Sequence, residues 1–519
     1  MLERIFYLLL IMVFILRISR KSLMVFQQNH YRANVYTQWL NKNLLSLFTV
    51  EYLVLIIVCI GLYIAGIDNW MIALFIFTYG FYKLIKELKH NYIKPLVYTR
   101  RVKTQIVFLM MIESLYFVLA FRADLIIGAI LLFEIIGWLF VYPMHILDKP
   151  IEVLIANNYL NEAKHVLRAH HDLKIIGITG SYGKTSTKHV IQSVLEQKYY
   201  SYMTPASFNT PMGITKCVRG ELKPIHEVFV CEMGASCVGE ITELMEFVKP
   251  NIGVVTSVGP QHLNTFKSIE NITKEKMQAI ELLPNDGLGI INIDNEYLKK
   301  YKIKNNCKIL TVSMKDKQAD YYAYDLSYDI KGSSFKVLLH DEEVIFKTRL
   351  LGEHNIGNCL IGVAIGDSLG LSVKEIQKGL LNLDYVPHRL ELKKFNNFMF
   401  IDNAFNSNPV SSKLALKTLK EMPYEHLIIT PGFIDLGKDE DRYNYEFGQA
   451  IAENADEVYL IGKLQTKHIY NGLRDSNFDM HRVRVYNHFK EAVDDIYKHK
   501  DPNRVICLLE NDLPDAFSK

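Results

Sequence analysis

A short glycine-rich segment carries the clearest chemistry in this 519-residue chain. Residues 174–188 read KIIGITGSYGKTSTK, an apolar stretch followed by glycines, a lysine and hydroxyl residues. Glycines let backbone N–H groups approach a polyphosphate, the lysine supplies positive charge, and the first hydroxyl can bind Mg²⁺. This pattern predicts an ATP phosphate site made by Gly180, Ser181, Gly183, Lys184, Thr185 and Ser186.

An ordinary glycine turn between a strand and a helix is the alternative explanation of this segment. The first glycine of the longer phosphate-loop pattern would fall at Ile178, so the match is to the shorter G-x-x-G-K-T form. The preceding apolar run, the lysine and the hydroxyl residues all stand where phosphate binding needs them, which favours ATP binding.

Three more residues follow apolar runs and offer ligands to a metal. Glu232 ends one run, His262 follows the next, and Lys276 lies on the helix expected after that. Mg²⁺ prefers oxygen ligands, so Thr185 and Glu232 could jointly hold it at a bound nucleotide. Taken singly, a histidine is more often structural, and a lone lysine is usually a solvated charge.

After about residue 150 the chain has the pattern of a soluble α/β protein. Runs 226–234 and 252–259 read as buried strands followed by polar turns and helices, which predicts a mainly parallel sheet. Segment 320–350 alternates polar and apolar residues, which predicts an antiparallel appendage. The expected elements of a second block are strands at 398–402, 426–432, 457–462, 482–486 and 504–510 and a helix at 439–455.

These patterns predict an α/β fold in three parts. Residues 1–150 are expected to form a transmembrane region, 151–386 a phosphate-loop ATPase domain, and 387–519 a C-terminal Rossmann-like α/β domain. The last part has no G-x-G-x-x-G motif, so a dinucleotide ligand is not expected.

Apolar runs dominate the first 150 residues, and crossing a bilayer takes about 20 mainly apolar residues. We predict four or five transmembrane helices, the second and fifth being clearest, while the first contains Arg17 and could lie in the membrane interface. Glu113 and Glu134 lie in the last two runs, where they suggest substrate contact or, more simply, contact with neighbouring helices. The runs are 5–18, 47–67, 71–82, 106–121 and 125–141.

The basic residues predict orientation and exclude one class of partner. They gather after the first and third apolar runs, and such loops stay inside the cell. We therefore expect a multi-pass cell-membrane protein with the lipid bilayer as a partner and cytoplasmic catalytic domains. The formal net charge is only +3, so no nucleic-acid partner is expected. The seven cysteines lack paired C-x-x-C spacing and read as reduced thiols, not as a zinc site.

Nine motifs in order resemble the Mur ligase family of ATP-dependent amide-forming enzymes. Within that family, the resemblance is greatest to the branch that adds D-alanyl-D-alanine to the UDP-N-acetylmuramoyl tripeptide. It runs from about residue 175 to residue 431 and continues more loosely to the C-terminus. The motifs are GITGSYGKTSTK, TPASFNTPMGI, CEMGASCVGEI, NIGVVTSVGPQHLNTF, ITKEKMQAI, INIDNE, GEHNIGN, PHRLE and DNAFNSNP.

The resemblance implies two Mg²⁺ sites and a catalytic set. Lys184 matches the lysine that binds the γ-phosphate, with Thr185 and Glu232 on the first Mg²⁺. Lys276 matches a lysine whose amine takes up CO₂ as a carbamate and, with His262, holds the second Mg²⁺. A carbamate would turn a cation into an oxygen ligand.

Other matched positions are expected around the nucleotide and the substrates. Arg389 and Asp402 match catalytic residues that reach the nucleotide phosphates and magnesium from the last domain. The matches on the adenine and nucleotide side are Asn292, Asp294, His354, Asn355 and Asn358. The matches on the substrate side are Asn209 and Ser236 and, near the amine, Asn406 and Asn408.

The implied reaction joins a carboxylate to an amine in two steps. The carboxylate attacks the γ-phosphate to give an acyl phosphate and ADP, and the amine of an amino acid or dipeptide then displaces phosphate. Closure of the domains is expected to exclude water from the acyl phosphate.

The expected acceptor follows from departures from the D-alanyl-D-alanine-adding branch. Predicted membrane helices replace the soluble domain that binds UDP in that branch, and Asp435 stands where glutamate is common. We therefore expect a carboxylate on a cell-wall or lipid-linked surface-glycan precursor. Addition of D-alanyl-D-alanine to the nucleotide-linked muramoyl tripeptide is the alternative.

Two other classes of protein fit part of the sequence. An ATP-driven transporter would join membrane helices to a phosphate loop, but the chain has no L-S-G-G-Q-like signature, and transport leaves Lys276 and Asn408 unexplained. An inactive binding module would have lost phosphate or metal residues, yet Lys184, Glu232 and His262 are present.

Overall fold

The computed structural model describes residues 2–29, 31–47, 49–90, 92, 95–329, 331–404, 408–433, 436 and 439–511. The chain divides into two compact units, Met1–Asn158 and Tyr159–Lys519. The boundary falls later than the predicted residue 150 because the last helix of the first unit, α7 (Val141–Ala169), continues into the second without interruption.

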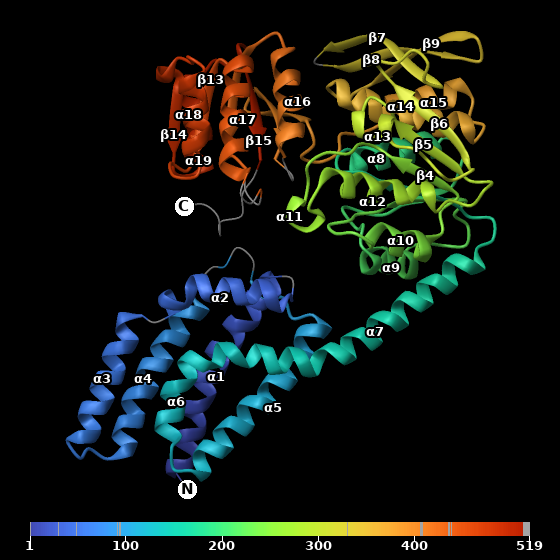
Figure 1. Cartoon of the computed structure of the whole chain (residues 1–519). Helices are drawn as coiled ribbons and strands as arrows, with labels where there is room; N and C mark the ends of the chain where they lie inside the picture. The colour runs from blue at the N-terminus through green and yellow to red at the C-terminus, as the bar shows by residue number, and fades with distance from the viewer. Residues whose placement is uncertain are drawn as a thin grey trace. The chain divides into compact units, whose positions relative to one another are not determined.

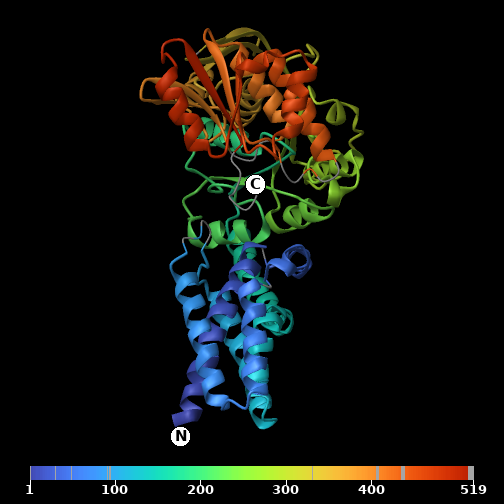
Figure 2. The ribbon, with the colours of Figure 1, turned by 90° about the vertical axis from the view of Figure 1, so that its left-hand side faces the viewer.

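The first unit is built of helices, and Figures 1 and 2 show α1, α4, α5 and α6 running side by side while α2 lies across them. The helix α1 contacts α4, α5 and α6, and buried side chains such as Phe14, Phe26 and Phe133 form the core between them. The helices are α1 (Leu2–Gln28), α2 (Ala33–Leu47), α3 (Val50–Ile64), α4 (Asn69–Leu88), α5 (Arg100–Arg122), α6 (Ile126–Ile136), the 3-10 turn η1 (Gly137–Phe140) and α7.

The sequence predicted four or five membrane-spanning helices, but fewer helices are long and apolar enough to cross a membrane. Among the described residues, two helical stretches meet it, Arg100–Arg122 and Ile126–Ala169. The run at 47–67, predicted as one of the clearest spans, forms only the 15-residue α3. Thr49 caps the start of α3 through its side chain, and Gly66 follows the end of α3 with a φ of 74°, a conformation that terminates helices.

The glutamates of the last two apolar runs both contact the first helix. The Oγ of Ser19 donates a hydrogen bond to Glu113 Oε1 at 2.6 Å, and Arg17 forms a buried ion pair with Glu134. The contacts agree with the simpler prediction that these glutamates face neighbouring helices.

The central domain is built on a nine-stranded sheet in the order β2-β3-β1-β4-β5-β6-β7-β8-β9. The pairs from β2 to β7 are parallel, and β7, β8 and β9 pair antiparallel, as predicted for 320–350. The strands are β1 (Lys174–Thr179), β2 (Ser201–Met203), β3 (Val228–Glu232), β4 (Ile252–Val255), β5 (Leu288–Asn292), β6 (Lys308–Ser313), β7 (Tyr321–Asp329), β8 (Gly332–Leu339) and β9 (Glu342–Thr348).

Helices cover both faces of this sheet because its buried strands are apolar on both sides. On β1, Ile176 and Ile178 pack in the core that contains α8 (Lys184–Leu195) and α14 (Glu353–Ser368), whereas Ile175 packs in the opposite core. The remaining helices are α9 (Pro211–Gly220), α10 (Glu240–Val248), α11 (Leu263–Phe266), α12 (Ile269–Glu281), α13 (Glu296–Lys300) and α15 (Val373–Leu381).

The C-terminal domain has a six-stranded sheet in the order β10-β11-β15-β12-β13-β14. Only the pair β10–β11 is antiparallel among these strands, and the five predicted strands are all present. The elements are β10 (Glu391–Phe395), β11 (Phe398–Asn403), α16 (Pro409–Lys420), β12 (Glu425–Thr430), α17 (Glu440–Asn454), β13 (Glu457–Ile461), α18 (Lys467–Asp475), the 3-10 turn η3 (Met480–Arg482), β14 (Val483–Tyr486), α19 (Phe489–His499) and β15 (Val505–Glu510).

Candidate active site

The predicted phosphate loop lies between β1 and α8 and requires its glycines. Gly180 and Gly183 have φ values of 152° and 82°, which favour glycine. A Cβ atom on Gly180 would lie 2.1 Å from Thr256 Oγ1, and one on Gly183 would lie 3.0 Å from Asn358 Oδ1. The loop is therefore shaped by close contacts to the end of β4 and to α14.

Ser181 fastens the loop to the end of β4 and is itself buried. Its backbone N–H donates to Ser257 O at 2.7 Å, and its hydroxyl donates to Gly259 O and accepts from Gly259 N, both at 3.1 Å. The hydroxyl of Ser181 thus already has two partners within the protein, and its contact with phosphate stays a prediction. Thr256 adds a second tie, because its hydroxyl donates to Tyr182 O at 2.5 Å.

The ammonium of Lys184 folds back over the loop. It donates to Gly180 O at 2.7 Å and to Ser181 O at 3.3 Å. Burial lowers the pKa of Lys184 to about 8, although the charge of Glu232 opposes this shift. Neutral carbonyl partners are readily exchanged for charged phosphate oxygens, which suits a lysine that receives a polyphosphate.

Glu232, at the carboxyl end of β3, is the most connected group of the site. Its Oε2 accepts from Thr185 Oγ1 and from Lys188 Nζ, both at 3.1 Å. Its Oε1 accepts from Asn209 Nδ2 at 3.1 Å. Burial alone would raise the pKa of Glu232, but the charges of Lys188 and Lys184 and these hydrogen bonds hold it below its ordinary value. The carboxylate is therefore ionised and faces the predicted metal ligand Thr185.

Lys276 is 1% exposed and lies in a different environment from an ordinary surface lysine. Its Nζ donates to Ala235 O at 3.1 Å and lies 5.8 Å from the ring centre of Phe266. Burial, and then the positive charge of Lys184, lower the pKa of Lys276 to about 7. The prediction that this lysine is part of the site, and not a solvated charge, is consistent with this burial.

The turn that begins at His262 reaches the same segment of chain. The exposed His262 has a φ of 52°, and its carbonyl accepts from Thr265 N at 3.0 Å. The hydroxyl of Thr265 donates to Ser236 O, next to the Ala235 carbonyl that binds Lys276. Ser236, predicted on the substrate side, also donates through its N–H to Glu240 Oε2 at 2.5 Å.

Residues predicted near adenine organise the turn after β5. Asn292 Oδ1 accepts from Asp294 N at 3.0 Å, and Asp294 accepts from Ser313 Oγ at 2.5 Å and Met314 N at 2.8 Å. Both side chains are therefore held in place by the turns that follow β5 and β6. Their contact with adenine stays a prediction.

The start of α14 lies against the phosphate loop. Asn358 accepts from Thr187 Oγ1 at 2.9 Å and donates to Asn355 Oδ1 at 3.1 Å, and Asn355 donates to Leu351 O at 2.9 Å. These asparagines thus position α8, a role the sequence did not predict. His354 differs, because its Nδ1 is buried with no hydrogen-bond partner among the residues that the structure describes, and burial and then Arg389 lower its pKa to about 4.

The predicted residues of the C-terminal domain are placed in different ways. The charge of Arg389, second to burial, lowers the pKa of His354, and it also acts on Lys184, so it lies within electrostatic range of the phosphate loop. Asp402 instead pairs within its own domain, with Lys393 Nζ at 2.6 Å and His388 Nδ1 at 2.8 Å. The contact of Asp402 with nucleotide phosphates stays a prediction.

Of the two asparagines predicted near the amine, the structure describes only Asn408. Asn408 caps α16, because its Oδ1 accepts from Val410 N at 3.2 Å and Ser411 N at 3.0 Å. A helix cap explains this asparagine without a substrate. Asn406, like Asp435, lies outside the described residues.

Lys188 is a site residue that sequence analysis missed. It lies one turn after Lys184 on α8, and residues four apart share a helix face. That spacing, together with the apolar residues around it, was the signal that could have identified it.

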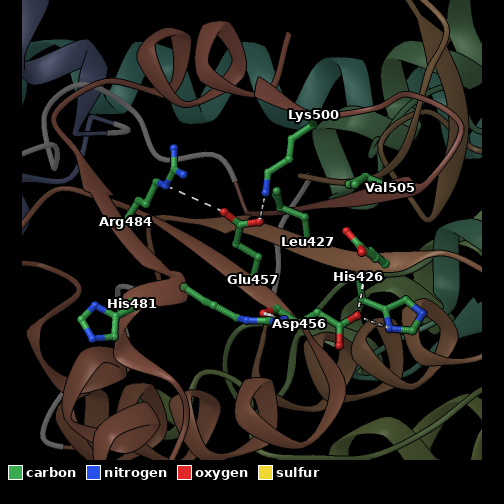
Figure 3. A pocket seen from close by; sticks show the side chains of 10 residues that line it. His426, Leu427, Asp456, Glu457, His481, Arg484, Lys500 and Val505 are labelled. Carbon is green, nitrogen blue, oxygen red and sulfur yellow. Dashed lines mark hydrogen bonds and ion pairs between the residues drawn. The ribbon is translucent and has the colours of Figure 1, made fainter. Parts of the chain in front are cut away.

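A separate cavity of about 290 Å³ lies at the opposite edge of the C-terminal sheet, where β12, β13 and β15 begin (Figure 3). Figure 3 shows Glu457 between Arg484 and Lys500, with which it forms ion pairs, and His426 beside Asp456. The cavity lies where these strands begin, whereas Asp402 lies near the end of β11. The charged residues of the cavity pair with one another, and the cavity does not belong to the phosphate site.

Two models of protein domains match the second unit. Residues 178–366 match the Mur ligase middle domain, and residues 388–509 match the Mur ligase, glutamate ligase domain. Together these matches cover more than half of the chain.

Similar proteins carry one recurrent name. The chain is 29% identical over 329 residues to the UDP-N-acetylmuramoyl-tripeptide--D-alanyl-D-alanine ligase of Buchnera aphidicola subsp. Baizongia pistaciae, covering 62% of this chain and 70% of that protein. It is 28% identical over 363 residues to the ligase of that name from Bacillus subtilis, covering 69% and 78%. The crystal structure of MurF ligase from Thermotoga maritima in complex with ADP superposes with a TM-score of 0.62 at 20% identity, covering 69% of this chain and 80% of that one.

Proposed function

This chain belongs to the Mur ligase family of ATP-dependent ligases, and from that premise we propose that it adds a dipeptide amine to the peptide carboxylate of a muramoyl peptide precursor. The observation that carries the proposal is the gathering of Lys184, Glu232 and Lys276, in which Lys184 lies within electrostatic range of both other groups. The relatives' names favour D-alanyl-D-alanine as the dipeptide. They therefore support this acceptor better than the expected surface-glycan carboxylate.

The residues at the phosphate loop fit ATP and a magnesium ion. The loop packs so closely against Thr256 and Asn358 that it requires glycine at positions 180 and 183, and beside it Thr185 and Glu232 offer adjacent oxygen ligands. When bound, Mg²⁺ would neutralise charge on phosphate oxygens. The unpartnered Nδ1 of His354 supports a polar ligand near the start of α14.

Lys276 fits a second metal site through carbamate formation. Only a neutral amine attacks CO₂, and a pKa of about 7 leaves a large neutral fraction at neutral pH. The carbamate would add oxygen ligands, and His262 is the predicted partner. This chemistry supports the two-metal proposal, because two cations would repel an unmodified ammonium.

The proposed reaction consists of two successive displacements. The acceptor carboxylate oxygen attacks the γ-phosphorus, and the bond to the leaving ADP breaks while Lys184 stabilises the transferring charge. The amine nitrogen then attacks the acyl carbon, loses a proton, and expels inorganic phosphate. Arg389 would approach the same charge from the C-terminal domain.

An assay of acceptors tests the proposal directly. Detergent-purified protein would receive ATP, D-alanyl-D-alanine and a muramoyl tripeptide carried either on UDP or on a lipid. We expect ADP release to require both the acceptor and the dipeptide, with a product mass equal to their sum less water. ADP release that needs neither substrate would contradict the ligase assignment.

A lipid-linked acceptor is the second candidate, and the two long apolar helical stretches of the first unit favour it. A membrane location would place the catalytic unit beside such a carrier. In the same assay, turnover of the lipid-linked acceptor at least about tenfold faster than the UDP-linked one would select this candidate.

The proposed location predicts a topology. Tags placed after Lys94 and at the C-terminus should resist external protease in intact cells, because positively charged loops stay inside. Permeabilised cells supply the control, since both tags should then be digested. A C-terminal tag that is cut in intact cells would rule out the cytoplasmic location.

A further inference from the structure

We propose that Lys188 is a positioning residue that joins the magnesium-binding carboxylate to the loop of residues 204–209. The inference deepens the proposed function, on which it rests, by connecting the nucleotide side of the site to the side that is predicted to hold the acceptor. Lys188 is the last residue of the motif GITGSYGKTSTK, but the resemblance assigned it no function. It lies on α8, one turn after the phosphate-loop lysine.

Lys188 is completely buried and makes two directed contacts. Its Nζ lies 3.1 Å from Glu232 Oε2 and donates to Ala206 O at 2.5 Å. A buried ammonium is costly unless it is paired and hydrogen-bonded, and here one carboxylate and one carbonyl provide that compensation. The side chain therefore bridges β3 and the loop that follows β2 from a third element, α8.

The loop of residues 204–209 wraps around Glu232. At its start, Thr204 Oγ1 accepts from Glu232 N at 3.1 Å, and at its end Asn209 donates to Glu232 Oε1 at 3.1 Å. In the middle, Ala206 has a φ of 46°, a conformation rare for a residue other than glycine. The carbonyl of this strained residue is the one that Lys188 binds. Lys188 thus holds the middle of a loop whose two ends are held by Glu232.

The same contacts orient the carboxylate itself. Asn209 holds Oε1, and Lys188 shares Oε2 with the hydroxyl of Thr185. A carboxylate oxygen has two lone pairs, so Lys188 can fix Oε2 through one of them while the other, which now accepts from Thr185, faces the predicted metal ligand. Loss of Lys188 would free both the carboxylate and the loop at once. A displacement of about 1 Å at a reacting group can lower a rate by about a hundredfold.

Two variants of the full-length enzyme test this role. Lys188→Met removes the charge and both contacts but keeps a side chain of similar length. Lys188→Gln keeps an N–H donor that can reach one of the two partners. We expect Lys188→Met to raise the KM of the muramoyl acceptor at least about tenfold, with ATP binding changed less than about threefold. The Lys188→Gln variant should be intermediate. Gln192→Met is the matched control, because Gln192 is a buried polar residue on the same helix that bonds Glu196 and Ser201 instead.

Hydrogen exchange tests the positioning role of Lys188 independently of the proposed ligase function. Without any substrate, amides of residues 204–209 should exchange at least about tenfold faster in Lys188→Met than in the wild type or in Gln192→Met. A wild type that fails to use any acceptor would contradict the proposed function but leave this measurement intact. The positioning role is wrong if loop exchange is unchanged, if the affinities for the acceptor and for ATP fall by the same factor, or if both Lys188 variants unfold.

Discussion

Replacing Lys184 with alanine should lower the rate of ADP formation by at least about a hundredfold while the protein stays folded. The ammonium contacts only loop carbonyls among the described hydrogen bonds, so its removal takes away charge at the phosphate site without opening the apolar core. Steady-state ADP release by purified protein, alongside a thermal unfolding curve, measures both parts of this result.

The control for this variant is Lys198→Ala. Lys198 is an exposed lysine just beyond the end of α8 and bonds to Gly370 O. Its replacement should leave turnover within about twofold of wild type, because a surface contact of this kind contributes little. If Lys184→Ala retained more than roughly a tenth of the wild-type rate, the phosphate-loop assignment would fail.

Replacing Lys276 with alanine should also lower ADP formation by about a hundredfold or more, because a lost metal ligand removes several kcal/mol of charge stabilisation. A small carboxylic acid added in solution should restore part of the activity, since it supplies the oxygens that the carbamate would have provided. The buried position of Lys276 leaves a space in which such an acid can bind. Turnover as a function of acid concentration is the measurement.

Lys274→Ala is the matched control, because this lysine lies on the same helix but is exposed. It should be fully active and unaffected by the acid. Full activity of Lys276→Ala would overturn the carbamate proposal.

The pKa of Lys276, about 7, also predicts a pH dependence of turnover. Below pH 7 the amine is mostly protonated and cannot react with CO₂. Turnover at low bicarbonate should therefore fall as the pH drops from about 8 to about 6.

Much of the fold could be predicted because its elements have strong local patterns. The strands β3, β4 and β11 to β15 lie within predicted runs, since buried parallel strands read as short continuous apolar stretches. The helix α2 was missed because it mixes polar and apolar residues without a long apolar run. The extent of α7 was missed as well, because the composition changes near residue 150 while the helix continues to Ala169.

The chemistry of the phosphate loop was determined by the sequence itself. Glycines with positive φ, a lysine and a hydroxyl residue are contiguous there, so their geometry follows from a single strand–loop–helix unit. The same holds for Glu232, because the carboxyl end of a parallel strand faces the edge where ligands bind. In both cases the local chain is sufficient to place the side chain.

Contacts between segments far apart in sequence were decided only by the tertiary structure. The bond of Asn209 to Glu232 and that of Thr187 to Asn358 depend on which neighbours packing brings together. Lys188 is the clearest case, because a lysine in a helix is ordinarily solvated, and nothing in its neighbours along the chain reveals Ala206 and Glu232 as its partners. A motif specifies residue types at fixed spacing, whereas burial and pairing depend on the packed surroundings, which decide what a charged side chain can do.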